Sequence, residues 1–192
     1  MKSLNELFSQ VILSNELSNN INAALRFSDP DGVLSGKSGW SFGKSQFDTQ
    51  NNGEALKCLA ECGFTALEIK GIVNQTIDVK PFAARLKAHK EIIEQYDEIQ
   101  LGYCINQAMN VITKYGVPVD NPSGILALAD YVNQYGSIGN GFVSYMKDLG
   151  ESVDALDVLS FKLDHTKYGR EHPLDCKRRY NNLVKIITEE GL

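Results

Sequence analysis

The helical pattern of this 192-residue chain is interrupted by one segment rich in glycine, serine and aromatic residues, between positions 32 and 52. On both sides of this segment, apolar residues recur every three or four positions, as in helices that bury one face. Inside it, Trp40, Phe42 and Lys44 occupy alternate positions, which indicates a short hairpin or an irregular β-loop. The sequence therefore predicts a mainly α protein, a helical bundle with one small β-lobe after the first helix.

The apolar spacing at the start of the chain predicts one bent helix or two consecutive helices over about 3–28. Pro30 disfavours helical geometry in the preceding residue, so we expect this helical region to end at Asp29. The later helices are expected over 51–63 with Asn51 or Asn52 as cap, 65–75 with Thr65 as cap, 79–115 with a break near Pro81 or Gly102, 123–136 starting at Ser123, 140–150, 153–169 and 173–190.

Composition and charge are those of an ordinary soluble globular protein, with 43% hydrophobic and 22% charged residues. The net charge of -5 argues mildly against binding to nucleic acid, which depends on lysine and arginine. Because the chain holds no repeat or long linker, we expect one domain over 1–192, with two lobes flanking a cleft.

No apolar run approaches the roughly 18 residues of a membrane span, so we expect no stable membrane insertion. The first twenty residues contain Asn, Glu and Gln where a signal peptide needs an unbroken apolar stretch. We therefore expect synthesis in the cytoplasm, with release or delivery if the target lies outside.

The cysteines and histidines give no pattern typical of a metal site. Four cysteines lack paired CxxC motifs, and three histidines have no partner at the spacing of a metal site or catalytic triad. We expect no metal and no cofactor, and buried free thiols. Cys58 and Cys62, four positions apart on a predicted helix, should touch on one face.

Two stretches around the loop resemble known enzymes. The segment "GWSFGKSQFD" at 39–48 looks like the aromatic-Gly-x-x-Gln-x-Asp segment of goose-type lysozymes and lytic transglycosylases, in the lysozyme-like superfamily. The upstream "LRFSD" at 25–29 resembles the end of the first helix in phage lysozymes, where the catalytic carboxylate lies, and "TKYGREHPLDCKRRYNN" at 166–182 is loosely similar to phage and bacterial cell-wall hydrolases. The resemblance implies cleavage of the β-1,4 glycan strands of peptidoglycan by a muramidase or lytic transglycosylase.

Glycoside cleavage requires a protonated carboxylic acid for the leaving oxygen, and usually a second carboxylate or a positioned water. Asp29 is the first candidate for the acid, because the negative end of a helix and nearby apolar rings favour the protonated form. The resembled enzymes have a glutamate there, whereas this chain has Asp29 and Asp31. Glu16 is the alternative if the first helix ends earlier, although it precedes Asp29 by 13 residues and is therefore expected to lie too far from the loop. Asp48 is the candidate second carboxylate, with an N-cap or Asx-turn as its structural alternative.

A further group of side chains is expected to contact the glycan: Trp40, Ser41 and Gln46 in the loop, and Asp130 and Gln134, with Tyr131 or Tyr135, on the helix that follows Ser123. Each has a structural alternative. A lone tryptophan is more often a core side chain, and the glutamine is equally explained as a group that satisfies loop backbone. The pair on the later helix is also compatible with a solvated face.

Three functions remain open from the sequence. The first is a phage endolysin or a delivered antibacterial effector that cleaves peptidoglycan, the latter with an immunity or delivery protein as partner. The second is a related glycanase acting on chitosan or chitin, because the acidic surface suits a cationic polymer. The third is an inactive lysozyme-like module that binds glycan or protein, motivated by the missing glutamate.

Overall fold

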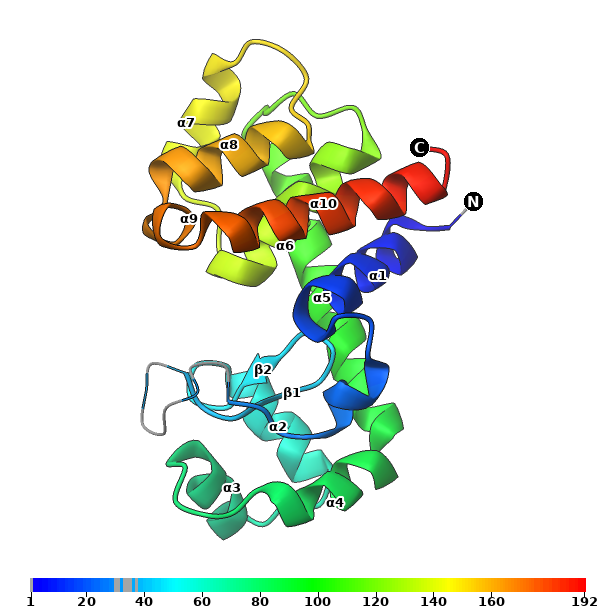
Figure 1. Cartoon of the computed structure of the whole chain (residues 1–192), viewed down its shortest axis with the longest axis vertical. Helices are drawn as coiled ribbons and strands as arrows, with labels where there is room; N and C mark the ends of the chain where they lie inside the picture. Colours follow the sequence, from blue (N-terminus) through cyan, green and yellow to red (C-terminus); the bar gives the residue numbers. More distant parts are fainter. Residues whose placement is uncertain (1, 30–31, 33–35, 37) are drawn as a thin grey trace. The chain divides into compact units, whose positions relative to one another are not determined.

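A computed structural model describes residues 2–29, 32, 36 and 38–192 (Figure 1). It is mainly helical, with a small antiparallel two-stranded sheet after the first helix, which confirms the predicted fold class. The chain forms two compact units, residues 1–15 with 101–192, and residues 16–100. Each unit has its own cluster of buried apolar side chains. The single domain over 1–192 stays a prediction.

The unit of residues 16–100 contains the hairpin and several short helices. Its elements are the end of α1 (Leu4–Leu17), the 3-10 helix η1 (Ile21–Leu25), β1 (Ser41–Phe42), β2 (Phe47–Asp48), α2 (Gly53–Glu61), α3 (Ala66–Val73), η2 (Lys80–Phe82), α4 (Ala83–Ala88) and the start of α5 (Lys90–Thr113). Two predicted caps are confirmed. The Asn52 side chain accepts a hydrogen bond from the Glu54 amide, and Thr65 forms a capping box with Glu68.

The end of the first helix differs from the prediction. α1 stops at Leu17, because Ser18 and Asn19 adopt positive φ angles of 49° and 65°. Asparagine tolerates this left-handed conformation, and short polar side chains compete with helical hydrogen bonds. After η1 the chain becomes extended at Arg26, so Asp29 does not lie at the C-terminus of an α-helix.

The hairpin turns tightly between two buried aromatic residues. Ser41 pairs with Asp48, and Phe42 pairs with Phe47 in the antiparallel register. Gly43 and Gln46 have positive φ angles of 77° and 53°, which the short connection requires. Both phenylalanines belong to the core of this unit. Their burial fixes which face of the hairpin points inward.

The unit of residues 1–15 and 101–192 is an all-helical bundle. Besides most of α1 and the later part of α5, it contains α6 (Pro122–Tyr135), α7 (Asn140–Asp148), α8 (Ala155–His165), α9 (Lys167–Glu171) and α10 (Pro173–Glu189). The closest packing joins α6, α8 and α10, whose green, orange and red ribbons lie together in Figure 1. Residues of α5, α6, α7, α8 and α10, together with Phe8 and Ile12 of α1, form its core.

Two later helix boundaries also differ from the prediction. The break in the long helical region falls at His89, between α4 and α5, whereas Pro81 lies in η2 and Gly102 lies inside α5. α6 is capped by Asn121, whose side chain accepts from the Gly124 amide, with Pro122 in the first turn. Proline fits the first turn because its missing N–H has no partner there in any case. Ser123 is therefore inside the helix.

Candidate functional site

Gln46 is held at both ends of its amide within the loop. Its Nε2 donates to the Gly43 carbonyl at 3.0 Å, and its Oε1 accepts from the Ser28 hydroxyl at 2.8 Å. The structure thus places Gln46 in the role of the structural alternative, a glutamine that satisfies groups of its own loop. Contact between this amide and a glycan stays a prediction.

Asp48 closes the hairpin and caps the turn after it. Its Oδ1 accepts from the amides of Gly39 and Gln50, and its Oδ2 accepts from the side chain of Asn51. Partial burial would raise the pKa of Asp48, but hydrogen bonds from Asn51, Gly39 and Gln50 outweigh it and hold the pKa below its ordinary value. An ionised carboxylate with both oxygens occupied matches the Asx-turn alternative better than a water-orienting role.

The remaining predicted loop residues lie around the first strand. Ser41 is 1% exposed and shares two backbone hydrogen bonds with Ser28, each of 2.8 Å. Trp40 is half-buried against the core of this unit, as the core alternative expected. Its indole Nε1 is buried without a hydrogen-bond partner among the residues that the structure describes. Asp29 directly follows the Ser28–Ser41 bridge and is half-buried, and Asp31 lies outside the described residues.

Glu16, the alternative acid of the sequence analysis, lies near the end of α1. Because α1 ends at Leu17, Glu16 lies in the last turn of the first helix and is half-buried. It opens the compact unit that also contains the hairpin. From there the chain runs through η1, whose Ala24 carbonyl accepts from the Gly43 amide at 2.8 Å. The condition set for the alternative acid is therefore met.

Asp97 of α5 is a buried carboxylate that contacts the hairpin, and the sequence analysis did not identify it. It is 2% exposed and accepts from the amides of Lys44 and Ser45, both at 2.8 Å. Burial raises the pKa of Asp97, while the hydrogen bonds from these two amides act in the opposite direction. The sequence could have indicated the burial of Asp97, because it lies four positions from Ile93 and four from Leu101, two apolar residues on the same helix face.

The four cysteines are free and buried, as expected. The thiol of Cys58 on α2 shares a hydrogen bond with that of Cys62, the C-cap residue of this helix, which confirms that the two side chains touch. That hydrogen bond, together with burial, raises the pKa of Cys58 above its ordinary value. Such a thiol is a poor nucleophile.

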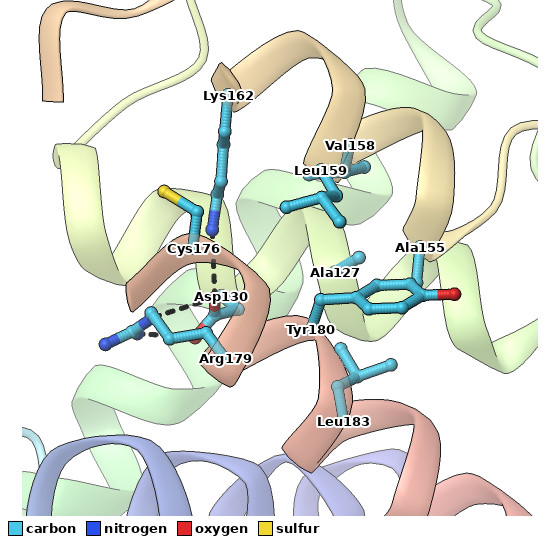
Figure 2. Close-up of a pocket in the computed structure, with 10 residues that line it drawn as sticks. All are labelled: Ala127, Asp130, Ala155, Val158, Leu159, Lys162, Cys176, Arg179, Tyr180 and Leu183. Carbon is cyan, nitrogen blue, oxygen red and sulfur yellow. Dashed lines mark hydrogen bonds and ion pairs between the residues drawn. The ribbon is translucent and has the colours of Figure 1, made fainter. Parts of the chain in front are cut away.

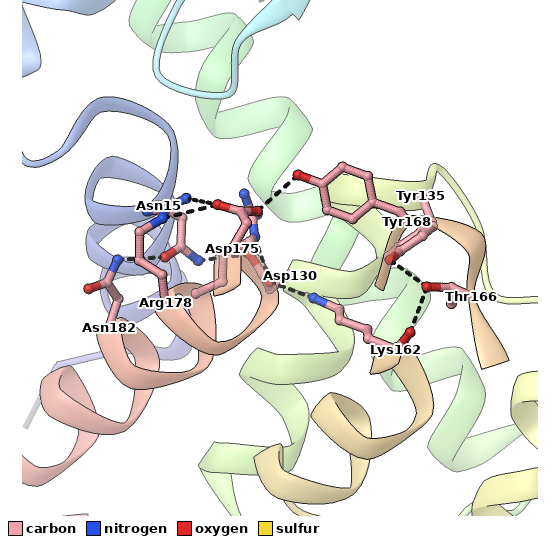
Figure 3. A network of polar contacts seen from close by, with 10 residues as sticks. Asn15, Asp130, Tyr135, Lys162, Thr166, Tyr168, Asp175, Arg178 and Asn182 are labelled. Carbon is pink, nitrogen blue, oxygen red and sulfur yellow. Dashed lines mark hydrogen bonds and ion pairs between the residues drawn. The ribbon is translucent and has the colours of Figure 1, made fainter. Parts of the chain in front are cut away.

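Asp130 lies inside a polar network of the helical unit (Figure 3). It is 3% exposed and accepts from Asn15 at 3.0 Å, from Lys162 at 3.1 Å and from two nitrogens of Arg179 at 3.2 and 2.5 Å. Burial alone would raise its pKa, but Arg179 and Lys162 lower it well below its ordinary value. A carboxylate in this position is neither on a solvated face nor accessible to a glycan.

A small pocket adjoins this network (Figure 2). Its volume is about 20 Å³, and it is lined by Ala127, Asp130, Ala155, Val158, Leu159, Lys162, Cys176, Arg179, Tyr180 and Leu183. A water needs on the order of 10–15 Å³ by this measure, so the space suits one or two waters and excludes a sugar ring. The pocket is therefore part of the packing of α6, α8 and α10.

The other expected contacts on α6 are also engaged by the protein. The rings of Tyr131 and Tyr135 stack at 4.4 Å, and the Lys162 ammonium lies about 6 Å from each ring centre. Gln134 is half-buried, and its Oε1 has no hydrogen-bond partner within the described part of the chain. Because this Oε1 is buried, contact between Gln134 and a glycan stays a prediction.

Comparison with known proteins gives no match to the chain, whether with a family model, a curated protein or a solved structure. In the part of the chain that the structure describes, no helix has the length and apolar character needed to cross a bilayer. Function therefore has to be inferred from the residues and their geometry.

Proposed function

We propose that this protein cleaves the glycan strands of peptidoglycan, with Glu16 as the general acid. The observation that carries the proposal is the end of α1 at Leu17, which puts a glutamate in the last turn of the first helix. A glycine-rich hairpin and then further helices follow. This is the order of elements in the lysozyme-like enzymes that the loop sequence resembles.

The hairpin supports this proposal because the resembling residues form one connected loop. Gly43 turns the chain, Gln46 binds Gly43, and Asp48 closes the base of the hairpin on Gly39. These hydrogen bonds join the resembling residues to one another within the hairpin. The loop therefore behaves as one unit that shapes one wall of a site.

The proposal assigns the two catalytic roles to other carboxylates than the sequence analysis did. Glu16 takes the place of Asp29 as acid, and it has the longer side chain, which helps it to reach a leaving oxygen. Asp29, at the edge of the hairpin, becomes the candidate second carboxylate, because it follows the Ser28–Ser41 bridge directly, while Asp48 caps the turn after the hairpin. In glycosidases the second carboxylate stabilises the oxocarbenium ion, acts as nucleophile, or orients water.

The decisive experiment measures release of reducing ends and anhydro-sugars from purified peptidoglycan by the wild type and by Glu16→Gln, Asp29→Asn and Asp48→Asn. We expect Glu16→Gln to lower release at least about 100-fold while the thermal midpoint and sedimentation with peptidoglycan stay unchanged, because general acid catalysis contributes about that much. Asp48→Asn should mainly lower stability, because the amide cannot accept all three hydrogen bonds.

Other outcomes would contradict the proposal in distinct ways. Full release by Glu16→Gln together with loss in Asp29→Asn would return the acid to Asp29. Wild-type turnover of chitosan without turnover of peptidoglycan would make the protein a chitosan glycanase. Sedimentation with peptidoglycan without any release by the wild type would make it a binding module.

A further inference from the structure

We infer that Asp97 is a positioning residue, which reaches from α5 to the tip of the hairpin and fixes the loop in which Gln46 and Asp48 lie. The inference rests on the proposed function for the use of that loop. Its structural part, the fixing of the loop by a buried carboxylate, is tested separately below.

The two carboxylate oxygens of Asp97 bind two different backbone amides. Oδ2 accepts from the Lys44 amide and Oδ1 accepts from the Ser45 amide, both at 2.8 Å. These two amides lie side by side in the turn, and Ser45 and Asp97 are buried. Water therefore cannot easily replace the carboxylate, and two amides would lose their partner without it.

The second step is the close approach of the turn to α5. A Cβ atom added to Gly43 would lie 3.2 Å from Oδ1 of Asp97 and 2.7 Å from the ring of Phe47. On its other side, Gly43 donates to the Ala24 carbonyl. The tip of the hairpin is therefore held between η1 and α5.

The third step leads from the tip of the hairpin to the proposed site. Gln46 follows Ser45 directly, and its amide joins the Gly43 carbonyl to the Ser28 hydroxyl. Ser28 precedes Asp29 and is paired with Ser41. A shift of the turn on Asp97 would pass through these hydrogen bonds to Asp29.

The choice of residue supports positioning over simple stability. A buried carboxylate has a desolvation cost that a well-packed apolar side chain would avoid. Ile93 and Leu101, one helical turn away on either side, are buried apolar residues. A carboxylate at this point gives what an apolar residue lacks, two acceptors that orient two neighbouring amides.

The test compares Asp97→Asn with Glu98→Gln, which removes the same charge from the next, exposed position of α5. Amide exchange is followed residue by residue by NMR. The asparagine amide offers one oxygen for two N–H groups, so we expect Lys44 or Ser45 to exchange at least about tenfold faster and to lose its downfield shift. Thr49, whose amide donates to the Trp40 carbonyl outside the turn, serves as the internal reference. Unchanged exchange at both Lys44 and Ser45 overturns the inference.

The second arm measures turnover of soluble peptidoglycan fragments. We expect Asp97→Asn to lower kcat about tenfold or more, with the thermal midpoint close to that of the wild type and Glu98→Gln unaffected. Wild-type kcat in a variant with faster amide exchange would make the contact merely structural and overturn the inference. A wild type without turnover defeats the proposed function, whereas the exchange arm still decides whether Asp97 holds the turn.

Asp97→Glu covers the case in which the asparagine variant does not fold. It keeps the charge, but its extra methylene must displace the carboxylate toward Gly43, where there is no free space. We expect the same faster exchange at Lys44 and Ser45 and the same loss of kcat. An unchanged turn in this variant would also contradict the inference.

Discussion

The Ser28 hydroxyl donates to Oε1 of Gln46 at 2.8 Å and so ties the segment before Asp29 to the tip of the hairpin. The same glutamine donates to the Gly43 carbonyl, so one side chain connects Ser28 with the turn of the hairpin. The side chain of Gln46 therefore fixes the conformation of the loop. Its removal should lower the stability of the protein as well as any activity of the loop.

We predict that Gln46→Ala destabilises the protein by about 1–3 kcal/mol, because two hydrogen bonds of a partly buried group are lost. The measurement is the free energy of unfolding from urea denaturation. Gln50→Ala is the matched control, since Gln50 is exposed and its side chain makes one long hydrogen bond, 3.3 Å, to Val73. Equal effects of the two substitutions would contradict the role assigned to Gln46.

Gly43→Ala should destabilise the protein more than Gly63→Ala does. Both glycines have φ of 77°, so both substitutions incur the strain of the left-handed conformation, about 1 kcal/mol. Only at Gly43 does the new Cβ meet the Phe47 ring and Asp97, whereas nothing lies within 4 Å at Gly63. The difference between the two unfolding free energies therefore isolates the close approach of Gly43 to Phe47 and Asp97, and equal unfolding free energies would contradict this close approach.

The sequence predicted this hairpin because its signals are local. Glycine, serine and alternating aromatic residues occur within a few positions, and the caps at Asn52 and Thr65 are equally local. The end of α1 was missed because Ser18 and Asn19 interrupt the helix without interrupting the apolar spacing around them. Local backbone conformation decided that boundary, and hydrophobic periodicity does not report it.

The burial of Asp130 between two cationic side chains was not predictable for a different reason. Its partners Lys162 and Arg179 stand 32 and 49 positions away along the chain. From sequence alone, a polar residue on an otherwise apolar helix is interpreted as facing solvent or a ligand, because its partners are known only from the tertiary packing. Asp97 is the same case, since its partners lie 53 and 52 positions away in the hairpin turn.

Asp130→Asn should destabilise the protein by about 3–5 kcal/mol, because it leaves the buried Lys162 and Arg179 without their counter-charge. The unfolding free energy of this variant is compared with that of Asp164→Asn, which changes an exposed aspartate one residue before the end of α8. A loss near zero would mean that the two cations find other partners and that the network is not what holds α6, α8 and α10 together.

The Glu68–Arg85 pair should make the hairpin unit sensitive to acid. Hydrogen bonds from Arg85 at 2.9 and 3.1 Å, and then from the Thr65 amide, lower the pKa of Glu68 to about 2. A carboxyl with a lowered pKa in the folded state stabilises that state above its ordinary pKa and loses this effect as the pH falls. We therefore expect this contribution to be complete above about pH 4.5 and to disappear between about pH 4.5 and pH 2.

Glu68→Gln provides the test, because it keeps the shape of the side chain and removes the titration. The difference in unfolding free energy between wild type and variant should be constant near neutral pH and shrink below about pH 4.5. Glu91→Gln, at an exposed position near the start of α5, should show a smaller pH dependence. A difference between wild type and Glu68→Gln that does not change with pH would mean that the pKa of Glu68 is the same in the folded and unfolded states, and that Arg85 contributes only through its stacking on Phe64 and Phe82.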